Sequence, residues 1–299
     1  MKVLLTGVKG QLGKTMSLLK PNNLNLIEIT RKELDLENSR KCFELILSYK
    51  PDWVINAAAY TAVDLAEKQI EKAYRINAEA PRQFSKALAS YGGKLLHIST
   101  DFVFDGQKKN PYLPSDKTNP INIYGKSKSA GEEAIQKVLG SSNQYTIVRT
   151  SWLMSNFGKN FALTILKLIR EKKNISVVND QFGSPTSCKS LAQTCWEIVN
   201  YKNNQTSNEL PKILHWSNLG KASWYDVASY ILDTSKKLDF KLNCEKITPI
   251  SSSDYKTEAK RPFNSVLDSS LISEILKVNN VSWQDSIKTI LEEYLTSYN

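Results

Sequence analysis

The feature that most constrains the fold is an apolar run at the start of the chain that ends in a glycine-rich turn. Residues 2–6 form the run, the turn reads Gly7-Val8-Lys9-Gly10-Gln11-Leu12-Gly13, and a helical pattern follows. Strand, glycine turn and helix in this order favour a dinucleotide site, although G-x-x-G-x-x-G also suits a turn without a ligand. Gly7 permits the turn, Gly10 lets the backbone approach a pyrophosphate, and Gly13 allows helix and sheet to pack closely. Amides at the helix start suit phosphates. We therefore expect cofactor contacts from Gly7, Gly10, Gln11, Leu12 and Gly13.

Strand-like and helix-like patterns alternate through the first 150 residues. Apolar runs stand at 24–29, 53–56, 94–99 and 145–149, with helical patterns at about 38–49 and 69–90 and a third that ends near 139. This alternation predicts an α/β fold, a Rossmann-type doubly wound parallel sheet covered on both faces. We expect an NAD(P)-binding domain over 1–150 and mainly a smaller C-terminal substrate-binding lobe over 151–299, with a helix at about 189–201 returning to the main domain. Residues 203–211 are predicted to be a surface loop.

The second strand ends at Thr30-Arg31, where a dinucleotide fold contacts the adenosine ribose. An acid at this point would bind the 2′-hydroxyl of NAD, whereas the guanidinium of Arg31 suits a 2′-phosphate. We therefore expect NADPH as the cofactor, with NADH as the alternative, and we expect Asp35 and Leu36 near the adenine. The competing interpretation is that Arg31 is a solvated turn residue.

Three small residues, Ala57-Ala58-Ala59, follow the third strand directly. They would let a cofactor press against the backbone, and Thr61 stands just beyond them. A tightly packed strand–helix junction is the alternative interpretation.

The fourth apolar run ends at Thr100, and Tyr124 and Lys128 follow after a long loop. A spacing of four places Tyr124 and Lys128 on one helix face. An ammonium about 4 Å from a phenol favours the phenolate by roughly 4 kcal/mol, enough to bring its pKa toward neutrality. Thr100 would hold a carbonyl oxygen beside the phenol, because the carboxyl edge of a parallel sheet is where ligands bind. We therefore expect Thr100, Tyr124 and Lys128 to be catalytic. The chain contains 13 Tyr, so Tyr-x-x-x-Lys alone is a weak signal.

Composition excludes several other classes of protein. The net charge of +10 suits polyanions, but the lysines are dispersed and no aromatic–basic platform is present, so we expect no nucleic-acid partner. No apolar run of about 18 residues occurs, which predicts no membrane span. The four cysteines are scattered, as expected for buried thiols in a cytoplasmic protein. His97 and His215 stand in apolar company and read as strand residues near a core.

Motifs along nearly the whole chain resemble the extended form of the short-chain dehydrogenase/reductase superfamily, and within it the reductases of nucleotide-linked sugars. They are the glycine turn, 56–64 (NAAAYTAVD), 99–106 (STDFVFDG), 122–128 (NIYGKSK), Gly131-Glu132, 149–152 (RTSW), 158–161 (GKNF), 178–186 (VNDQFGSPT) and 261–265 (RPFNS). Their joint occurrence in this order is more specific than any one of them.

The resemblance implies that a nicotinamide coenzyme delivers hydride to C4 of a dTDP-linked 4-keto-6-deoxyhexose. Tyr124 would protonate the new oxygen, and Lys128 would lower the pKa of that phenol and bind the nicotinamide ribose. Thr100, Asp101 and Trp152 would contact the sugar, and Arg261 would contact the diphosphate. The alternatives are a core position for Trp152 and an Arg261 that satisfies nearby carbonyls.

Some members of the family bind magnesium through acidic residues at a dimer contact, but the matching positions here are Thr15, Lys189 and Gln193. We therefore expect no Mg²⁺ or other metal site, and a monomer or weak homodimer. Two rival functions remain open. One is another reductase or epimerase of the same fold, and the other is a non-catalytic regulatory subunit that binds cofactor without turnover.

Overall fold

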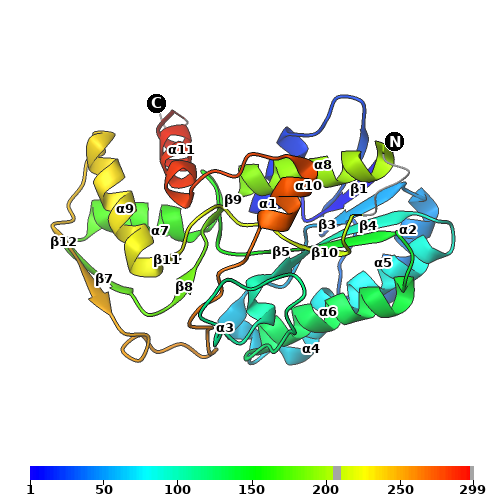
Figure 1. Ribbon diagram of the computed structural model, residues 1–299, viewed down its shortest axis with the longest axis horizontal. Coiled ribbons are helices and arrows are strands. Elements are labelled where there is room, and N and C mark those ends of the chain that lie inside the picture. Colours follow the sequence, from blue (N-terminus) through cyan, green and yellow to red (C-terminus); the bar gives the residue numbers. More distant parts are fainter. Residues whose placement is uncertain (205–209, 297–299) are drawn as a thin grey trace.

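The computed structural model describes residues 1–204 and 210–296. Within these ranges two packed bodies lie side by side, a larger one around a central sheet and a smaller one built mostly from the second half of the chain (Figure 1). Of the predicted surface loop, residues 205–209 lie outside the described residues. Among the described residues, no helix is both long and apolar enough to span a bilayer.

The central sheet has six strands in the order β10-β5-β4-β3-β1-β2, all parallel. The strands are β1 (Lys2–Thr6), β2 (Asn25–Ile29), β3 (Trp53–Asn56), β4 (Lys94–Thr100), β5 (Tyr145–Thr150) and β10 (Ile213–His215). The chain first adds β2 on one side of β1 and then β3 on the other. This reversal is the switch point at which doubly wound folds bind ligands. The predicted Rossmann-type sheet is therefore confirmed, with β10 as an additional edge strand.

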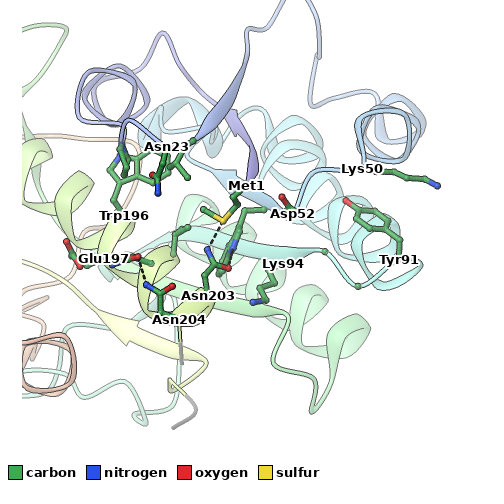
Figure 2. Close-up of a pocket in the computed structure, with 17 residues that line it drawn as sticks. Met1, Asn23, Lys50, Asp52, Tyr91, Lys94, Trp196, Glu197, Asn203 and Asn204 are labelled. Atoms are coloured by element: carbon green, nitrogen blue, oxygen red, sulfur yellow. Dashed lines mark hydrogen bonds between the residues drawn. The ribbon is translucent and has the colours of Figure 1, made fainter. Parts of the chain in front are cut away.

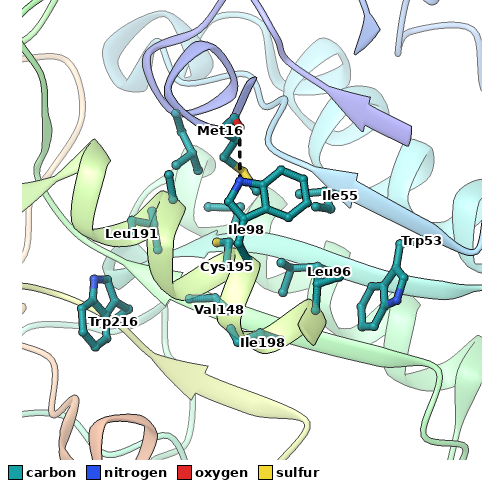
Figure 3. Close-up of a cluster of buried hydrophobic side chains, with 14 of the residues drawn as sticks. Met16, Trp53, Ile55, Leu96, Ile98, Val148, Leu191, Cys195, Ile198 and Trp216 are labelled. Carbon is teal, nitrogen blue, oxygen red and sulfur yellow. Dashed lines mark hydrogen bonds between the residues drawn. The ribbon is translucent and has the colours of Figure 1, made fainter. Parts of the chain in front are cut away.

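Helices cover both faces of this sheet because neighbouring strand residues point to opposite sides. Val3 and Leu5 enter the core beneath α1 and α8, shown in Figure 3, whereas Leu4 enters the core beneath α2, α5 and α6. One face carries α1 (Gln11–Leu18), α8 (Cys188–Asn204) and α10 (Ser270–Leu276), and the other carries α2 (Ser39–Tyr49), α5 (Ala80–Ala89) and α6 (Ile123–Leu139). Three segments from the second half of the chain, α8, β10 and α10, thus belong to the larger body.

The predicted helix at 69–90 is interrupted. It consists of α4 (Ile70–Tyr74), a π-helical turn η1 (Arg75–Glu79) and α5. The π-turn carries Asn77, which is buried and hydrogen-bonds both the backbone of Tyr60 and the hydroxyl of Ser127. A Cβ on Gly131 would lie 2.1 Å from the Asn77 carbonyl oxygen, so only glycine lets α6 approach this turn. These tertiary contacts explain a break that helix propensity does not indicate.

The smaller body has its own hydrophobic core. It contains α7 (Phe161–Glu171), α9 (Trp224–Lys237) and α11 (Trp283–Thr296) around the parallel pair β7 (Asn174–Val178) and β12 (Lys246–Ile250). Two-residue strands connect the bodies: β6 (Leu153–Met154) with β9 (Thr186–Ser187), and β8 (Phe182–Gly183) with β11 (Ala222–Ser223). The short α3 (Val63–Ala66) and the 3₁₀ turn η2 (Asp101–Val103) follow β3 and β4.

Candidate active site

A cavity of about 630 Å³ opens at the carboxyl edge of the sheet, beside an adjoining pocket of about 190 Å³ that shares Gly7, Lys9, Gly10, Ala58 and Ala59 with it. The cavity is lined by most of the predicted site residues: Gly7, Gly10, Gln11, Leu12, Ala57, Ala58, Ala59, Thr61, Thr100, Asp101, Tyr124, Lys128 and Trp152. The adjoining pocket is lined by Arg31, Asp35 and Leu36. Gly13 and Arg261 line neither.

The glycine turn has the geometry of an anion site. Gly7 adopts φ 77°, and a Cβ there would lie 2.8 Å from the backbone of Ala57. A Cβ on Gly13 would lie 2.1 Å from the Gly7 carbonyl oxygen, so Gly13 acts by packing rather than by lining the cavity. The N-cap of α1, Gly10, provides no side-chain hydrogen bond, and the first turn holds no acid. The Gly10 amide donates to the Gly7 carbonyl at 2.8 Å, whereas the amides at the start of α1 are available to phosphate oxygens.

Residues that the sequence did not single out complete this wall of the cavity. Lys9 and Lys159 line it and add positive charge beside the turn. The side chain of Gln11 accepts hydrogen bonds from Ser155 and Asn160, both at 2.8 Å, and so ties the glycine turn to the segment before α7. The positions of Lys9 and Lys159 within two glycine-containing motifs were the only available signal.

Helix α6 delivers Tyr124 and Lys128 to one cavity, as predicted. Asn122 is the N-cap of this helix. Its side chain accepts a hydrogen bond from the Gly125 amide at 2.8 Å and donates one to the Lys260 carbonyl at 2.7 Å. A Cβ on Gly125 would lie 2.1 Å from the Phe102 carbonyl oxygen, so this glycine lets the helix start press against the turn after β4. That contact brings Tyr124 beside Thr100.

The electrostatics differ from the sequence-based expectation. Burial raises the pKa of Tyr124 to about 12, the Asp101 carboxylate adds to this, and a hydrogen bond with Thr100 opposes it. Lys128 is 1% exposed, and its Nζ donates to the Ile98 carbonyl at 2.6 Å and lies 3.2 Å from His97 Nε2. Burial lowers the pKa of Lys128 to about 8, against the opposing charge of Glu132. The role of Lys128 in lowering the phenol pKa stays a prediction, because burial dominates both groups and the net shift of the Tyr124 pKa is upward.

Two orphaned buried atoms mark the wall beside Tyr124. Within the described residues, Oδ2 of Asp101 and Oγ1 of Thr150 make no hydrogen bond, and both residues line the cavity. Thr100 Oγ1 donates to the other oxygen of Asp101 at 3.0 Å. Burial raises the pKa of Asp101 to about 6. Buried polar groups without partners are costly, so this wall is suited to a polar ligand.

A buried ion pair lies one turn beyond Lys128 along α6. Arg149 on β5 contacts Glu132 through two nitrogens, the shorter distance being 2.6 Å, and Ser99 also donates to Glu132. Both charged residues are at most 3% exposed, and the guanidinium lies 5.1 Å from the Phe104 ring centre. The pair is hydrogen-bonded throughout, as a buried pair must be to persist. Glu132 and Arg149 appeared in the sequence only as members of motifs.

At the adjoining pocket, the guanidinium of Arg31 is 69% exposed and lies 3.1 Å from Glu37 and 3.7 Å from Asp35. The structure therefore places Arg31 where the sequence predicted it, but with two carboxylates as partners. Leu36 is buried in the core beneath α2 as well as lining the pocket.

The two residues expected from the smaller body behave differently. Trp152 lines the cavity with a positive φ of 45° and stacks in parallel on Trp224, with ring centres 3.4 Å apart. Both terminal nitrogens of the Arg261 guanidinium donate hydrogen bonds to the Asp64 carboxylate, at 2.7 and 3.1 Å. That pair lowers the pKa of Asp64. Arg261 thus joins the segment between β12 and α10 to α3, and it does not line the cavity.

Among the described residues, no group of three or more His, Cys, Asp or Glu side chains is arranged to hold a metal ion. Lys189, one of the three non-acidic positions, forms an ion pair with Glu293 at 2.9 Å. All four cysteines are buried free thiols, and His97 and His215 are buried strand residues, as predicted.

The chain is similar to known proteins over nearly its whole length. The family model described as RmlD substrate binding domain matches residues 1–296. The chain is 36% identical to dTDP-4-dehydrorhamnose reductase from Aggregatibacter actinomycetemcomitans, over 97% of this chain and 98% of that protein. It is 34% identical to the Escherichia coli K12 enzyme of the same name, over 99% of each.

Solved structures lead to the same family. A dTDP-4-dehydrorhamnose reductase from Clostridium acetobutylicum superimposes with a TM-score of 0.88 at 35% identity, covering 99% of this chain and 100% of that one. The Bacillus anthracis enzyme, solved in complex with NADP, gives a TM-score of 0.87 at 34% identity over 98% and 99% of the two chains. The chain therefore belongs to the RmlD substrate binding domain family, together with these dTDP-4-dehydrorhamnose reductases.

Proposed function

We propose that this protein reduces the C4 keto group of dTDP-4-dehydro-L-rhamnose to give dTDP-L-rhamnose, with NADPH as the preferred coenzyme. The observation that carries the proposal is the meeting of Thr100, Tyr124 and Lys128 with the glycine turn in one cavity. Membership of the reductase family supports the substrate, and the NADP complex of a relative supports the coenzyme. A non-catalytic regulatory subunit would not need to keep these three side chains together.

The residues present fit a dinucleotide. The uncapped start of α1 suits the pyrophosphate, Lys9 adds charge beside it, and the adjoining pocket at Arg31 suits the adenosine end. A 2′-phosphate would compete with Glu37 and Asp35 for the guanidinium of Arg31, whose side chain is 69% exposed. When bound, a reduced nicotinamide supplies the hydride that reduces C4 and is itself oxidised.

The chain's own residues would supply the proton and the orientation. Thr100 has a hydroxyl that can turn from Asp101 to the substrate carbonyl. Tyr124 would donate the proton of its Oη to the C4 oxygen, so that the ketone gains one hydride and one proton and becomes an alcohol. The phenolate then regains a proton from water. A phenol with a pKa of about 12 remains protonated at neutral pH, which is the form that reduction requires.

The smaller body would bind the sugar and its diphosphate, which makes it the substrate-binding lobe of the proposed division near residue 150. Trp152 is fixed against Trp224, so its exposed edge would offer a rigid surface to the sugar ring. Lys159 lines the same cavity and is a candidate for the diphosphate. Arg261 could reach a diphosphate only by leaving Asp64.

The test is an absorbance assay of NADPH consumption with purified protein and dTDP-4-dehydro-L-rhamnose, with product identified by mass and NMR. We expect NADPH loss and recovery of dTDP-L-rhamnose, with slower loss of NADH. Recovery of a sugar of different C4 configuration would identify another reductase. No consumption of either coenzyme by folded protein that binds NADPH would contradict the proposal and favour the regulatory role.

A further inference from the structure

A chain of hydrogen bonds leads from Lys128 across the sheet to β1. Lys128 Nζ lies 3.2 Å from His97 Nε2, and His97 Nδ1 lies 3.1 Å from Asn56 Nδ2. Thr6 Oγ1 then donates to Asn56 Oδ1 at 2.7 Å. The four side chains come from α6, β4, β3 and β1, and none is more than 2% exposed. Because these side chains are buried, a donor that faces another donor cannot hydrogen-bond to water instead, so the direction of each hydrogen bond affects stability.

The orientation of the Asn56 amide is fixed at its oxygen. Besides the Thr6 hydroxyl, the backbone N–H of Ala58 donates to Asn56 Oδ1 at 3.3 Å. Turning the amide over would set its NH₂ group against the Ala58 N–H, donor against donor. A backbone amide cannot reverse its role, so Asn56 Nδ2 faces His97 and donates to its Nδ1.

This orientation selects one form of His97. Burial, followed by the charge of Lys128, lowers the pKa of His97 well below its ordinary value, so the imidazole is neutral. A neutral imidazole carries one proton, and Nδ1 must be bare to accept from Asn56. The proton therefore sits on Nε2, and the Nε2–H points at Lys128 Nζ.

An ammonium group has three N–H donors and no lone pair, whereas an uncharged amine can accept one hydrogen bond. The Lys128 amine can accept from His97 Nε2–H while one of its own hydrogens is donated to the Ile98 carbonyl. An ammonium would face the imidazole N–H with a second donor. We propose that His97, oriented by Asn56, is a positioning residue that stabilises the uncharged amine of Lys128 over its ammonium form.

The groups around Lys128 set the background for this effect. Glu132, one turn further along α6, favours the ammonium, and its charge is largely engaged by Arg149. Tyr124 on α6 and Asp101 after β4 line the same cavity, and η1 contributes only the uncharged Asn77, against Ser127. Burial acts in the same direction as His97 and lowers the pKa of Lys128 to about 8. Among the described residues, only the charge of Glu132 is shown to raise the pKa of Lys128.

The consequence rests on the proposed function. A permanently charged Lys128 would stabilise the Tyr124 phenolate, but reduction needs the phenol as proton donor. An amine that is readily deprotonated leaves the phenol intact through a wider pH range. His97 and Asn56, which belong to the sheet, would thus influence the protonation of Tyr124 through Lys128, without contacting Tyr124 themselves.

The first test needs no substrate. Nitrogen-15 NMR of the imidazoles reports which ring nitrogen carries the proton, and the chain has only two histidines, which a His215→Gln variant would tell apart. We expect His97 to be neutral with its proton on Nε2. A proton on Nδ1 would overturn the proposal, whether or not the protein reduces any sugar.

The second test reverses the direction of the hydrogen bond between residue 56 and His97. Asn56→Asp keeps the two hydrogen bonds from Thr6 and Ala58 but turns the donor that faces His97 into an acceptor, which should move the imidazole proton to Nδ1. Carbon-13 NMR at the lysine Cε would follow Lys128, assigned by its loss in Lys128→Met. We expect the wild-type midpoint near 8 and a rise of at least about one pH unit in Asn56→Asp.

The matched control is Asn218→Asp, the same change at another buried asparagine, which accepts hydrogen bonds from the Ser187 amide and the Ser190 hydroxyl and donates one to Asn280. It should leave the Lys128 midpoint in place. A midpoint in Asn56→Asp that rises without a change of His97 tautomer would come from the added charge alone and would contradict the proposal. So would a wild-type midpoint at the ordinary value for lysine.

Discussion

The two edges of the central sheet each carry a hollow, and the hollows differ in kind rather than in size. The amino edge holds a hollow of about 770 Å³ between the start of β1, the end of α2 and the end of α8 (Figure 2). The hollow at the carboxyl edge measures about 630 Å³. At the amino edge the polar groups are paired close to solvent: the Lys2 amide donates to Asp52 at 2.7 Å, and Lys94 Nζ donates to the Lys202 carbonyl at 3.1 Å. At the carboxyl edge, Asp101 and Lys128 are buried with shifted pKa values.

Chain direction explains the difference. In a parallel sheet with crossover helices, helix N-termini gather at the carboxyl edge, bringing free amides and a positive dipole to that side only. Helix C-termini gather at the amino edge. Volume therefore does not identify the site, whereas buried titratable groups beside an uncapped helix start do.

The largest expected effect is at Tyr124. Tyr124→Phe removes only the hydroxyl that donates the proton, and kcat should fall by about 10² to 10⁴ with NADPH binding retained. Tyr91→Phe is the same change at the amino edge, where the hydroxyl donates to the Pro51 carbonyl. If steady-state kinetics showed the same fall in kcat for both variants, the proposal that only the carboxyl edge is catalytic would be contradicted.

Gly13→Ala should weaken coenzyme binding and stability together. The new Cβ would lie 2.1 Å from the Gly7 carbonyl oxygen, so the glycine turn must move. Overpacking of this kind costs about 1–3 kcal/mol, and we expect NADPH affinity to fall by roughly tenfold or more. Fluorescence titration and thermal unfolding would measure both, with Ser17→Ala on the same helix as control. Unchanged affinity would show that the turn does not hold the coenzyme.

Asp101→Asn should stabilise the protein at high pH. The folded-state pKa of Asp101, raised to about 6 from 3.8, means that its contribution to stability is present at low pH and lost as pH rises through 6. The variant should therefore gain at most about 3 kcal/mol in unfolding free energy near pH 8 and almost nothing near pH 4. Denaturant unfolding at both pH values measures this.

Asp105→Asn is the control of opposite sign. Hydrogen bonds from Gln107, Asn119 and Tyr112 outweigh the effect of burial and lower the pKa of Asp105. Its stabilising contribution is lost as pH falls, so this variant should be destabilised at high pH. The same response in both variants would contradict the assigned origin of the Asp101 shift.

Arg31→Ala should reduce the preference for NADPH over NADH by about tenfold, because one exposed charge-assisted contact is worth roughly 1–2 kcal/mol. The comparison of kcat/KM for the two coenzymes measures it. An unchanged ratio of the two kcat/KM values would mean that Arg31 does not bind the 2′-phosphate and only forms ion pairs with Asp35 and Glu37.

The smallest effect is expected at Glu197, an exposed residue that lines the amino-edge hollow. Glu197→Gln should change kcat/KM less than about twofold and stability by less than about 0.5 kcal/mol. A larger kinetic effect would mean that the amino edge takes part in turnover.

The sequence predicted the sheet well because its strands are short apolar runs between clear helical patterns. The run at 53–56 became β3 (Trp53–Asn56), and the run at 94–99 became β4 with one residue added. Most of the residues that line the cavity could also be predicted from the sequence, because the carboxyl ends of parallel strands meet at one edge of the sheet. The strand character around His215 was predicted, but the place of β10 in the central sheet was not, because its three residues pair with β5 across a long sequence separation.

What the sequence could not show depends on burial and on distant partners. The direction of the Tyr124 pKa shift follows from desolvation, which spacing along a helix does not report. The ion pair between Arg261 and Asp64 joins residues 197 positions apart. His97 read as a core histidine, and it is one, but its contact with Lys128 exists only because β4 and α6 pack together.

The most direct test of the central claim follows the hydride itself. NADPH carrying deuterium at both C4 positions would be mixed with the protein and dTDP-4-dehydro-L-rhamnose in a single turnover, and the product examined by NMR and mass spectrometry. The account predicts one deuterium, bound to C4 of dTDP-L-rhamnose, in the wild type, and little or no labelled product on the same timescale in Tyr124→Phe. Product without deuterium at C4, or no product from protein that binds both ligands, would contradict it.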